Sequence, residues 1–134
     1  MNWSGGNTHL VSLGDLIDRG PGSRQVVELM MKLDTQASKA GGAVHMVLGN
    51  HEVMVMTGDL RYVTDAEYAA FAGDESAAQR DQAYADYRRL NPGGEEAQVR
   101  EAFDQQYPPG FFALRRAYAS DGALGQWLLQ QPFV

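Results

Sequence analysis

Two polar segments carry most of the side chains that could perform chemistry. Residues 14–20 read GDLIDRG and residues 49–52 read GNHE, and each segment follows a short apolar run that is typical of a buried strand. Because the chain contains no cysteine, a metal site would use carboxylate, amide and imidazole ligands, which favours hard divalent ions or zinc over iron–sulfur chemistry. The histidine of these segments suits proton transfer at neutral pH, and the arginine has the fork geometry that binds the oxygens of an anion.

The pattern between the two segments predicts a βαβ unit. Residues 9–13 form the first expected strand, residues 44–48 form the second, and a helix with Ser23 as its N-cap is expected between them. A right-handed crossover makes such strands parallel, so both polar segments open at the same edge of the sheet. Parallel α/β sheets bind ligands at this edge, and we therefore expect Asp15 and Asn50 to lie there together.

Beyond residue 58 the composition changes to one typical of short helices. Thr64 and Glu67 have the spacing of a capping box, and glycine and proline residues separate the helical segments that follow. We expect helices at about residues 65–72, 77–90, 95–106 and from Gly122 onward. The chain thus divides into a core at residues 1–58 that carries both polar segments, a helical insertion at 59–121, and a helix with the approach to a next strand at 122–134.

Charge and hydropathy exclude several classes of function. The 134 residues include 11 basic and 17 acidic side chains, which gives a formal net charge of -6. This balance argues against a nucleic-acid platform, which needs many Lys and Arg side chains at phosphates, and against a polybasic membrane binder. The chain has no apolar stretch of the roughly 20 residues that a transmembrane helix needs, and its first residues do not resemble a signal peptide. We expect a soluble protein of a bacterium and leave its compartment, cytoplasm or periplasm, open.

The two polar segments together resemble a known pair of motifs. GDLIDRG followed by GNHE is similar to the second and third motifs of the calcineurin-like metallophosphoesterases, in particular the phosphoprotein phosphatases. The longer stretch at 49–63, the helical residues behind it and residues 125–132 resemble the Shewanella-like phosphatases. This resemblance implies an α/β fold, with part of a metallophosphoesterase β-sandwich core built around the βαβ unit and a helical insertion.

The resemblance also implies a reaction and a role for each motif residue. The expected reaction is hydrolysis of a phosphomonoester, in a phosphorylated protein or a small molecule, by hydroxide bound to two divalent ions, which are Mn, Fe or Zn. Asp15 matches the carboxylate that bridges the two ions, and Asn50 matches a neutral oxygen ligand to one of them. His51 matches the general acid, Asp18 matches the carboxylate that orients it, and Arg19 matches the arginine that holds the phosphate oxygens.

Each of these residues also has a purely structural interpretation. Asp15 and Asp18, taken without their motifs, are typical of helix caps or Asx turns that follow a strand. Arg19 could pair with a surface carboxylate instead of a phosphate. For Glu52 we prefer a structural role, as support for the loop or as a cap of the following helix, over a direct catalytic one.

Other candidate residues stay open between function and packing. His9 and His45 lie within the expected strands, where core-edge or outward-facing positions are the simpler interpretation. Arg61 and Tyr62 lie where the insertion begins, and they could line a substrate cleft or serve packing and surface pairing.

The family's metal site needs ligands beyond those in the two motifs. An Asp-x-His motif is expected upstream and two further histidines downstream, whereas the chain has only His9, His45 and His51. We therefore expect a fragment of a longer metallophosphatase with little activity by itself. Two alternatives are a dinucleoside polyphosphate hydrolase, whose pattern would include Pro21 but usually ends in GNHD, and a non-catalytic binding module.

Overall fold

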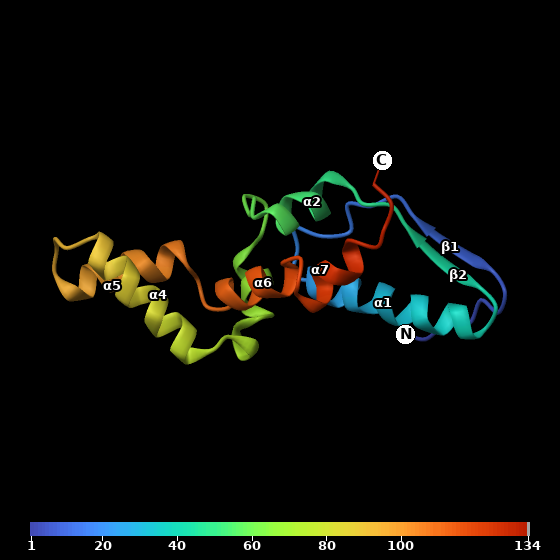
Figure 1. Ribbon diagram of the computed structural model, residues 1–134, viewed down its shortest axis with the longest axis horizontal. Coiled ribbons are helices and arrows are strands. Elements are labelled where there is room, and N and C mark those ends of the chain that lie inside the picture. The colour runs from blue at the N-terminus through green and yellow to red at the C-terminus, as the bar shows by residue number, and fades with distance from the viewer. Residues whose placement is uncertain (134) are drawn as a thin grey trace.

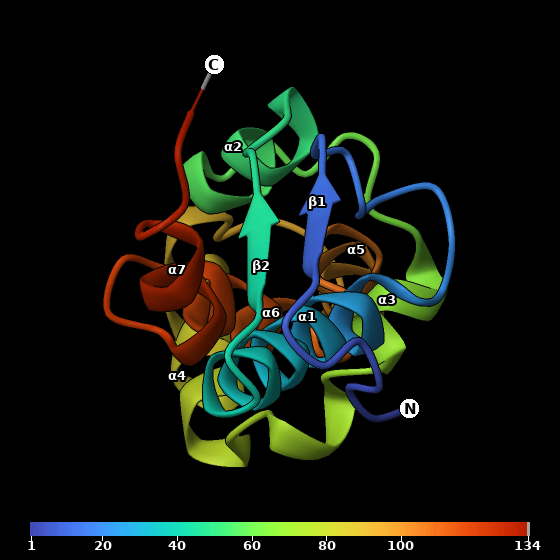
Figure 2. The same ribbon diagram turned by 90° about the vertical axis from the view of Figure 1, so that its right-hand side faces the viewer.

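The sheet of the computed structural model, which describes residues 1–133, consists of two parallel strands. β1 (His9–Ser12) pairs with β2 (Ala43–Met46), and Leu10 lies opposite Val44 in the register. Helix α1 (Ser23–Lys39) connects the strands, so the predicted βαβ unit and the α/β class are confirmed. Both strands run in one direction and end at the same edge, as Figure 2 shows.

Helix α1 covers one face of this sheet because its apolar side chains recur every three or four residues. The buried side of α1 consists of Val27, Met30, Leu33 and Ala37. The side of β2 that faces the core presents Val44 and Met46, and Leu48 continues this alternation beyond the strand. Figure 2 shows α1 and the other helices behind the strands, with the opposite face of the sheet toward the viewer. The core is therefore a helix layer packed on one face of a small sheet.

One local prediction differs from the structure near these elements. Helix α1 has Gly22 as its N-cap and begins at Ser23, whose hydroxyl accepts a hydrogen bond from the backbone N–H of Asp18 at 2.9 Å. Ser23 is thus not the cap, because a tertiary partner uses its side chain. At the other end of the described chain, Leu48 donates its N–H to Pro132 O at 2.9 Å and forms a parallel bridge with Phe133, while the approach to a next core strand stays a prediction. Val134 lies outside the described residues.

The remaining elements are helices. They are α2 (Asn50–Thr57), α3 (Asp65–Ala69), the 3-10 helix η1 (Ala72–Asp74), α4 (Ala77–Leu90), α5 (Glu96–Gln106), α6 (Phe111–Tyr118) and α7 (Ala123–Leu128). The sequence predicts helices at the positions of α3, α4, α5 and α7, but it gives no separate prediction of α6. Gly110 permits α6 to begin where it does, because its φ of 92° is left-handed and an added Cβ would lie 1.9 Å from the carbonyl oxygen of Tyr68. No helix within residues 1–133 is both long and apolar enough to cross a bilayer.

Helices α4 and α5 form a hairpin that projects at the end of the molecule opposite the strands (Figure 1). Phe103 of α5 is fully buried, with its ring 5.2 Å from that of Tyr84 and 5.5 Å from that of Tyr87. Arg80 of α4 reaches Asp104 of α5 at 2.7 Å. The hairpin therefore has an aromatic cluster of its own. The division of the chain at residues 58 and 121 stays a prediction.

The burial of Phe103 predicts a large difference between two truncations in this hairpin. Phe103→Ala should lower the free energy of unfolding by about 3–5 kcal/mol, because it removes a whole aromatic side chain from a packed cluster. Leu90→Ala is the matched control in α4, where the side chain is 76% exposed, and should stay within about 0.5 kcal/mol. Urea unfolding of both variants measures the two values, and equal losses would contradict the hairpin packing described here.

Candidate active site

The two polar segments meet where β1 and β2 end, and glycine makes their contact possible. A Cβ added to Gly14, whose φ is 87°, would lie 2.3 Å from the backbone nitrogen of Gly49. A Cβ added to Gly49 would lie 2.2 Å from Oδ1 of Asp15. Any larger residue at either position would push the segments apart. Both motif glycines are therefore required for the close approach of the two segments.

Glu52, in the first turn of α2, holds the two segments together. Its side chain is fully buried, and its carboxylate accepts the backbone N–H groups of Asp15 at 2.8 Å and Leu16 at 2.7 Å. The same carboxylate accepts the N–H of Gly49, the N-cap of α2, at 2.9 Å. Three donors around one buried carboxylate offset the cost of removing its charge from water. The contacts agree with the structural role that the sequence favoured for Glu52.

Asp15 and Asn50 lie at the strand ends, as predicted, and both residues are exposed. Oδ1 of Asp15 accepts the backbone N–H of His51 at 3.1 Å, and the Asn50 amide nitrogen has only a weak contact with the Met54 sulfur at 3.8 Å. One carboxylate oxygen and one amide oxygen therefore have no hydrogen-bond partner within residues 1–133. Such oxygens suit a hard divalent ion, although this part of the chain contains no cluster of three acidic or histidine side chains that could hold one. The pair thus fits a metal ion as a partial ligand set.

Asp18 and His51 form a buried pair beside these oxygens. Nδ1 of His51 lies 2.7 Å from Oδ2 of Asp18, and the two side chains are 9% and 1% exposed. Burial raises the pKa of the Asp18 carboxyl, the hydrogen bond with His51 opposes this shift, and the negative charge of Glu67 adds to it. The pairing fixes the imidazole through Nδ1, and Nε2 has no partner among the residues described. The ring is therefore held in one orientation with its second nitrogen available to a ligand.

A second buried carboxylate supports Asp18 from behind. The backbone N–H of Asp18 donates to the Ser23 hydroxyl, which in turn donates to the Glu67 carboxylate. Glu67 also accepts the N–H of Thr64 at 2.7 Å, which completes the predicted capping box of α3. The sequence indicated the cap but not the contact from Glu67 to Ser23 in α1. Ser23 and Glu67 are 44 positions apart in the sequence, so no local pattern predicts their contact.

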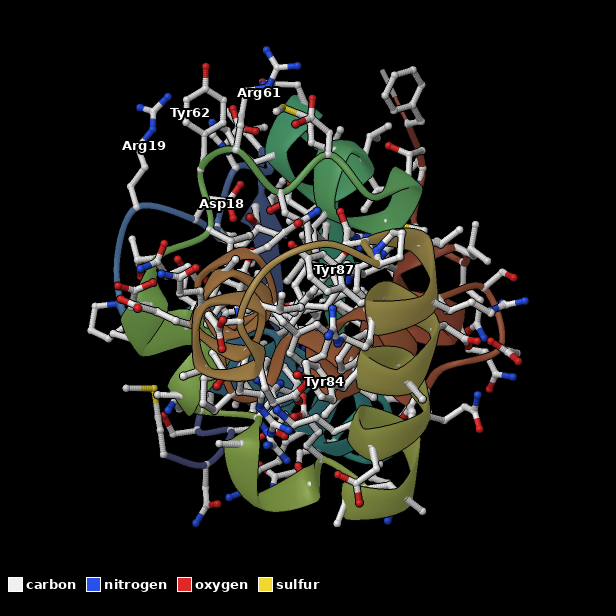
Figure 3. The ribbon with its side chains drawn as sticks, turned by 90° about the vertical axis from the view of Figure 1, so that its left-hand side faces the viewer. Asp18, Arg19, Arg61, Tyr62, Tyr84 and Tyr87 are labelled. Carbon is white, nitrogen blue, oxygen red and sulfur yellow. The ribbon has the colours of Figure 1, made fainter. Side chains whose placement is uncertain are left out.

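Arg19 lies at the rim of the site and contacts Tyr62. Its backbone N–H donates to the carbonyl oxygen of Tyr62 at 3.2 Å, and its guanidinium carbon lies 5.0 Å from the centre of the Tyr62 ring. The surface ion pair considered for Arg19 is absent within residues 1–133. Arg61 instead pairs with Asp59, at 2.8 Å. In Figure 3 Arg19, Tyr62 and Arg61 project from the same side of the molecule, at the top of the view.

Backbone strain is concentrated in the first motif. Asp15, Asp18 and Arg19 have φ angles of 53°, 73° and 63°, and they are the non-glycine residues with positive φ in the described part of the chain. Left-handed backbone costs free energy for residues other than glycine, less for Asp than for Arg, and surrounding contacts stabilise it here. Such residues are typical of sites where side-chain placement matters more than local stability.

Comparison with known proteins now identifies the family. The model of the calcineurin-like phosphoesterases matches residues 4–110. The chain belongs to the calcineurin-like phosphoesterase family. Its mixed α/β structure matches part of the fold of a solved structure, that of the cold-active protein-tyrosine phosphatase of a psychrophilic Shewanella species, with a TM-score of 0.57 and 31% identity. That match covers 97% of this chain and 28% of the solved chain.

Curated relatives are similar over shorter stretches. Shewanella-like protein phosphatase 2 of Arabidopsis thaliana is 44% identical over 62 residues, which are 46% of this chain and 16% of that protein. Shewanella-like protein phosphatase 1 of Plasmodium berghei is 33% identical over 94 residues, 70% of this chain and 24% of that protein. An uncharacterized protein of Schizosaccharomyces pombe is 45% identical over 69 residues, 52% of this chain and 21% of that protein. The chain thus spans less than a quarter of the length of these relatives.

The structure gathers the predicted site residues of this chain at one sheet edge, while their roles stay predictions. His9 and His45 lie elsewhere, on exposed positions of the two strands, with Nδ1 of His9 2.9 Å from Nε2 of His45. For Tyr62 the sequence allows two roles, lining a substrate cleft or packing, and in the structure its ring lies against Arg19.

The buried contacts of Glu52 predict a strong effect on stability. Glu52→Ala should lower the free energy of unfolding by about 3 kcal/mol or more, because it leaves three backbone N–H groups without an acceptor. Glu52→Gln keeps one acceptor oxygen in place and should lose roughly half as much. Urea unfolding checks both, and a loss below about 1 kcal/mol for the alanine variant would be inconsistent with these contacts.

The buried Asp18 carboxyl predicts a pH-dependent stability. Its pKa is raised above the usual 3.8, so the folded state binds a proton more readily than the unfolded state. The stability of the native protein relative to the Asp18→Asn variant should therefore fall as the pH rises from 3.8 through the raised pKa of this carboxyl. Urea unfolding of both proteins across this range measures the difference. A difference that rises with pH would mean that the pKa of Asp18 is lowered.

Proposed function

We propose that this chain supplies one side of a metal-dependent phosphomonoesterase site whose substrates are phosphorylated proteins or small phosphoesters. The observation that carries the proposal is the buried Asp18–His51 pair, at 2.7 Å, placed beside the free oxygens of Asp15 and Asn50. The printed names of the relatives, which include protein phosphatases and a protein-tyrosine phosphatase, support the substrate class. We also propose that residues 1–58 form the part of the core that carries this site.

The metal ions would be held in part by Asp15 and Asn50. Two divalent ions, Mn, Fe or Zn, would supply an activated water for attack on phosphorus when they are bound. Asp15 would contribute its free carboxylate oxygen to the metal site, because its other oxygen is held by the His51 N–H. Asn50 contributes a neutral amide oxygen from the first turn of α2.

His51 would protonate the leaving oxygen through Nε2. Asp18 occupies Nδ1 and therefore fixes both the tautomer and the plane of the ring. The carboxylate also stabilises the imidazolium form, which is the proton donor. General acid catalysis of this kind contributes about 10²- to 10⁴-fold in rate.

Arg19 would bind the phosphate oxygens. Its guanidinium group lies at the exposed rim and makes no ion pair in the described part of the chain, so its donors are available to an anion. The left-handed backbone at Arg19 directs this side chain, and the hydrogen bond to Tyr62 O maintains that conformation. Lysine at this position would carry the charge but not the two-pronged geometry.

A chimera provides the direct test of the proposed reaction. Residues 1–134 would replace the corresponding segment of the solved Shewanella phosphatase, which supplies the rest of a phosphatase chain. The chimera should hydrolyse p-nitrophenyl phosphate in the presence of manganese, and His51→Ala should lower kcat about 10²- to 10⁴-fold. Arg61→Ala, which alters an exposed ion pair, is the matched control and should retain the activity of the chimera.

Metal binding by the chain itself provides a control that does not depend on the chimera. Manganese titration by water-proton relaxation should detect weak binding that Asp15→Ala abolishes and Asp59→Ala leaves intact.

Hydrolysis by the chimera that persists in the His51→Ala variant would contradict the role of His51. Manganese binding that is unchanged in the Asp15→Ala variant would contradict the role of Asp15.

A further inference from the structure

Two buried side-chain oxygens have no hydrogen-bond partner within residues 1–133. They are Oδ1 of Asp18 and the hydroxyl of Tyr118, which is the last residue of α6. Tyr118 and the side chain of Asp18 are each only 1% exposed, so bulk water does not reach these atoms. A polar group that is buried without a partner destabilises the fold, and native proteins contain few of them. Each of the two oxygens therefore needs a partner.

Both side chains line the same small cavity in the core. Its other polar lining residues are Ser23 and Glu67, and the remaining lining side chains are apolar. The cavity leaves about 10 Å³ of space for the centre of a water molecule. One buried water needs roughly this much space and two to four polar partners. The cavity therefore fits a single water molecule and is too small for an organic ligand.

The protonation of Tyr118 determines how a water would be bound between the two oxygens. Burial raises the pKa of the Tyr118 hydroxyl above its usual 10.0, and the negative charges of Glu67 and Asp18 add to this shift. The hydroxyl therefore keeps its proton and can donate it, whereas an ionised carboxylate can only accept. A water that accepts from Tyr118 and donates to Oδ1 of Asp18 satisfies both atoms.

A hydrogen bond at Oδ1 also affects the contact between Asp18 and His51. The other carboxylate oxygen, Oδ2, lies 2.7 Å from Nδ1 of His51. A carboxylate that is bonded through one oxygen can still turn about its terminal torsion, for which the rotamer wells are broad. Bonds at both oxygens hold the carboxylate in one plane. The imidazole, which is oriented by Oδ2, is then held in place as well.

We propose that this cavity binds one water molecule, through which Tyr118 positions the Asp18–His51 pair. Tyr118 is a positioning residue, because it acts through Asp18 and does not itself reach the strand-end oxygens. The inference rests on the proposed function for the role of His51 as a proton donor, whereas the water and its two partners do not depend on that role. A Tyr118 that only packed against Phe71, whose ring centre is 6.1 Å away, would not use its hydroxyl.

Urea unfolding of the 134-residue chain tests the link between Tyr118 and Asp18. Tyr118→Phe removes only the hydroxyl and should raise the equilibrium constant for unfolding about three- to ten-fold. In the Asp18→Ala background, where the water has lost its acceptor, the same substitution should change this constant less than about two-fold. Tyr87→Phe in α4 is the matched control and should change it less than about two-fold in both backgrounds.

The sign of the Tyr118→Phe effect is decisive even where Asp18→Ala does not fold. Removing a buried hydroxyl that has no partner would stabilise the chain, because it removes an unsatisfied polar group. A Tyr118→Phe variant that is as stable as the native chain, or more stable, therefore overturns the inference. An equal loss of stability in both backgrounds overturns it too.

Two further measurements separate the water and the positioning role from a general effect on stability. A crystal structure of the chain should show one water within about 2.5–3.0 Å of both oxygens, and a direct bond between the oxygens would overturn the inference. In NMR spectra the Nδ1–H signal of His51 should shift in Tyr118→Phe and stay in place in Tyr87→Phe. An unshifted signal in Tyr118→Phe overturns the positioning role.

The chimera distinguishes a failure of this inference from a failure of the proposed function. In an active chimera, Tyr118→Phe should lower kcat about two- to ten-fold and leave KM within about two-fold, because it acts on the proton donor and not on substrate binding. Coupling between Tyr118 and Asp18 in a chimera that hydrolyses no phosphomonoester supports the bound water and contradicts the proposed function. Hydrolysis by the chimera without that coupling overturns this inference alone.

Discussion

The buried carboxylate of Glu52 is the interaction on which the rest of the site depends. It lies in the first turn of α2 and binds backbone N–H groups from the loop after β1 and from the N-cap of its own helix. Hydrogen bonds to a charged acceptor are stronger than neutral ones, and a buried charge without them would be very unfavourable. The two strand-end segments are therefore fixed relative to each other by one side chain. The position of His51 relative to Asp18 follows from that connection.

A second feature of the site is that its acidic groups are buried close to one another. Asp18 lies near Glu67, and Ser23 bridges the two through its hydroxyl and through the N–H of Asp18. Burial and the neighbouring charge both raise the pKa of Asp18, while the imidazole of His51 acts in the opposite direction. The carboxylate consequently holds His51 more firmly when the ring is charged than when it is neutral.

Much of this arrangement follows from the sequence, and the remainder depends on contacts that no local pattern encodes. The alternation of apolar residues predicts β2, and the capping box at Thr64 predicts the start of α3, because each rule involves neighbouring residues. The spacing of the two motifs places Asp15 and Asn50 at one edge because parallel strands must end there. The contact of Glu67 with Ser23 and that of Tyr62 with Arg19 join residues more than 40 positions apart. Only the folded chain brings these pairs together. The sequence therefore leaves the role of Tyr62 open, and its prediction of Ser23 as the N-cap of α1 is wrong.

The left-handed backbone at Asp15, Asp18 and Arg19 has a consequence for how the site forms. In a peptide with this segment alone, ordinary φ angles would be favoured, most clearly at Arg19, because the tertiary contacts of this conformation would be missing. The donors and acceptors that enforce the conformation come from α2, from α1 and from the segment before α3. The site therefore exists only while these elements are docked, and a ligand that binds it also binds the assembled state of the helices. Ligand binding and the local unfolding of α2 are then thermodynamically linked, because each equilibrium shifts the other.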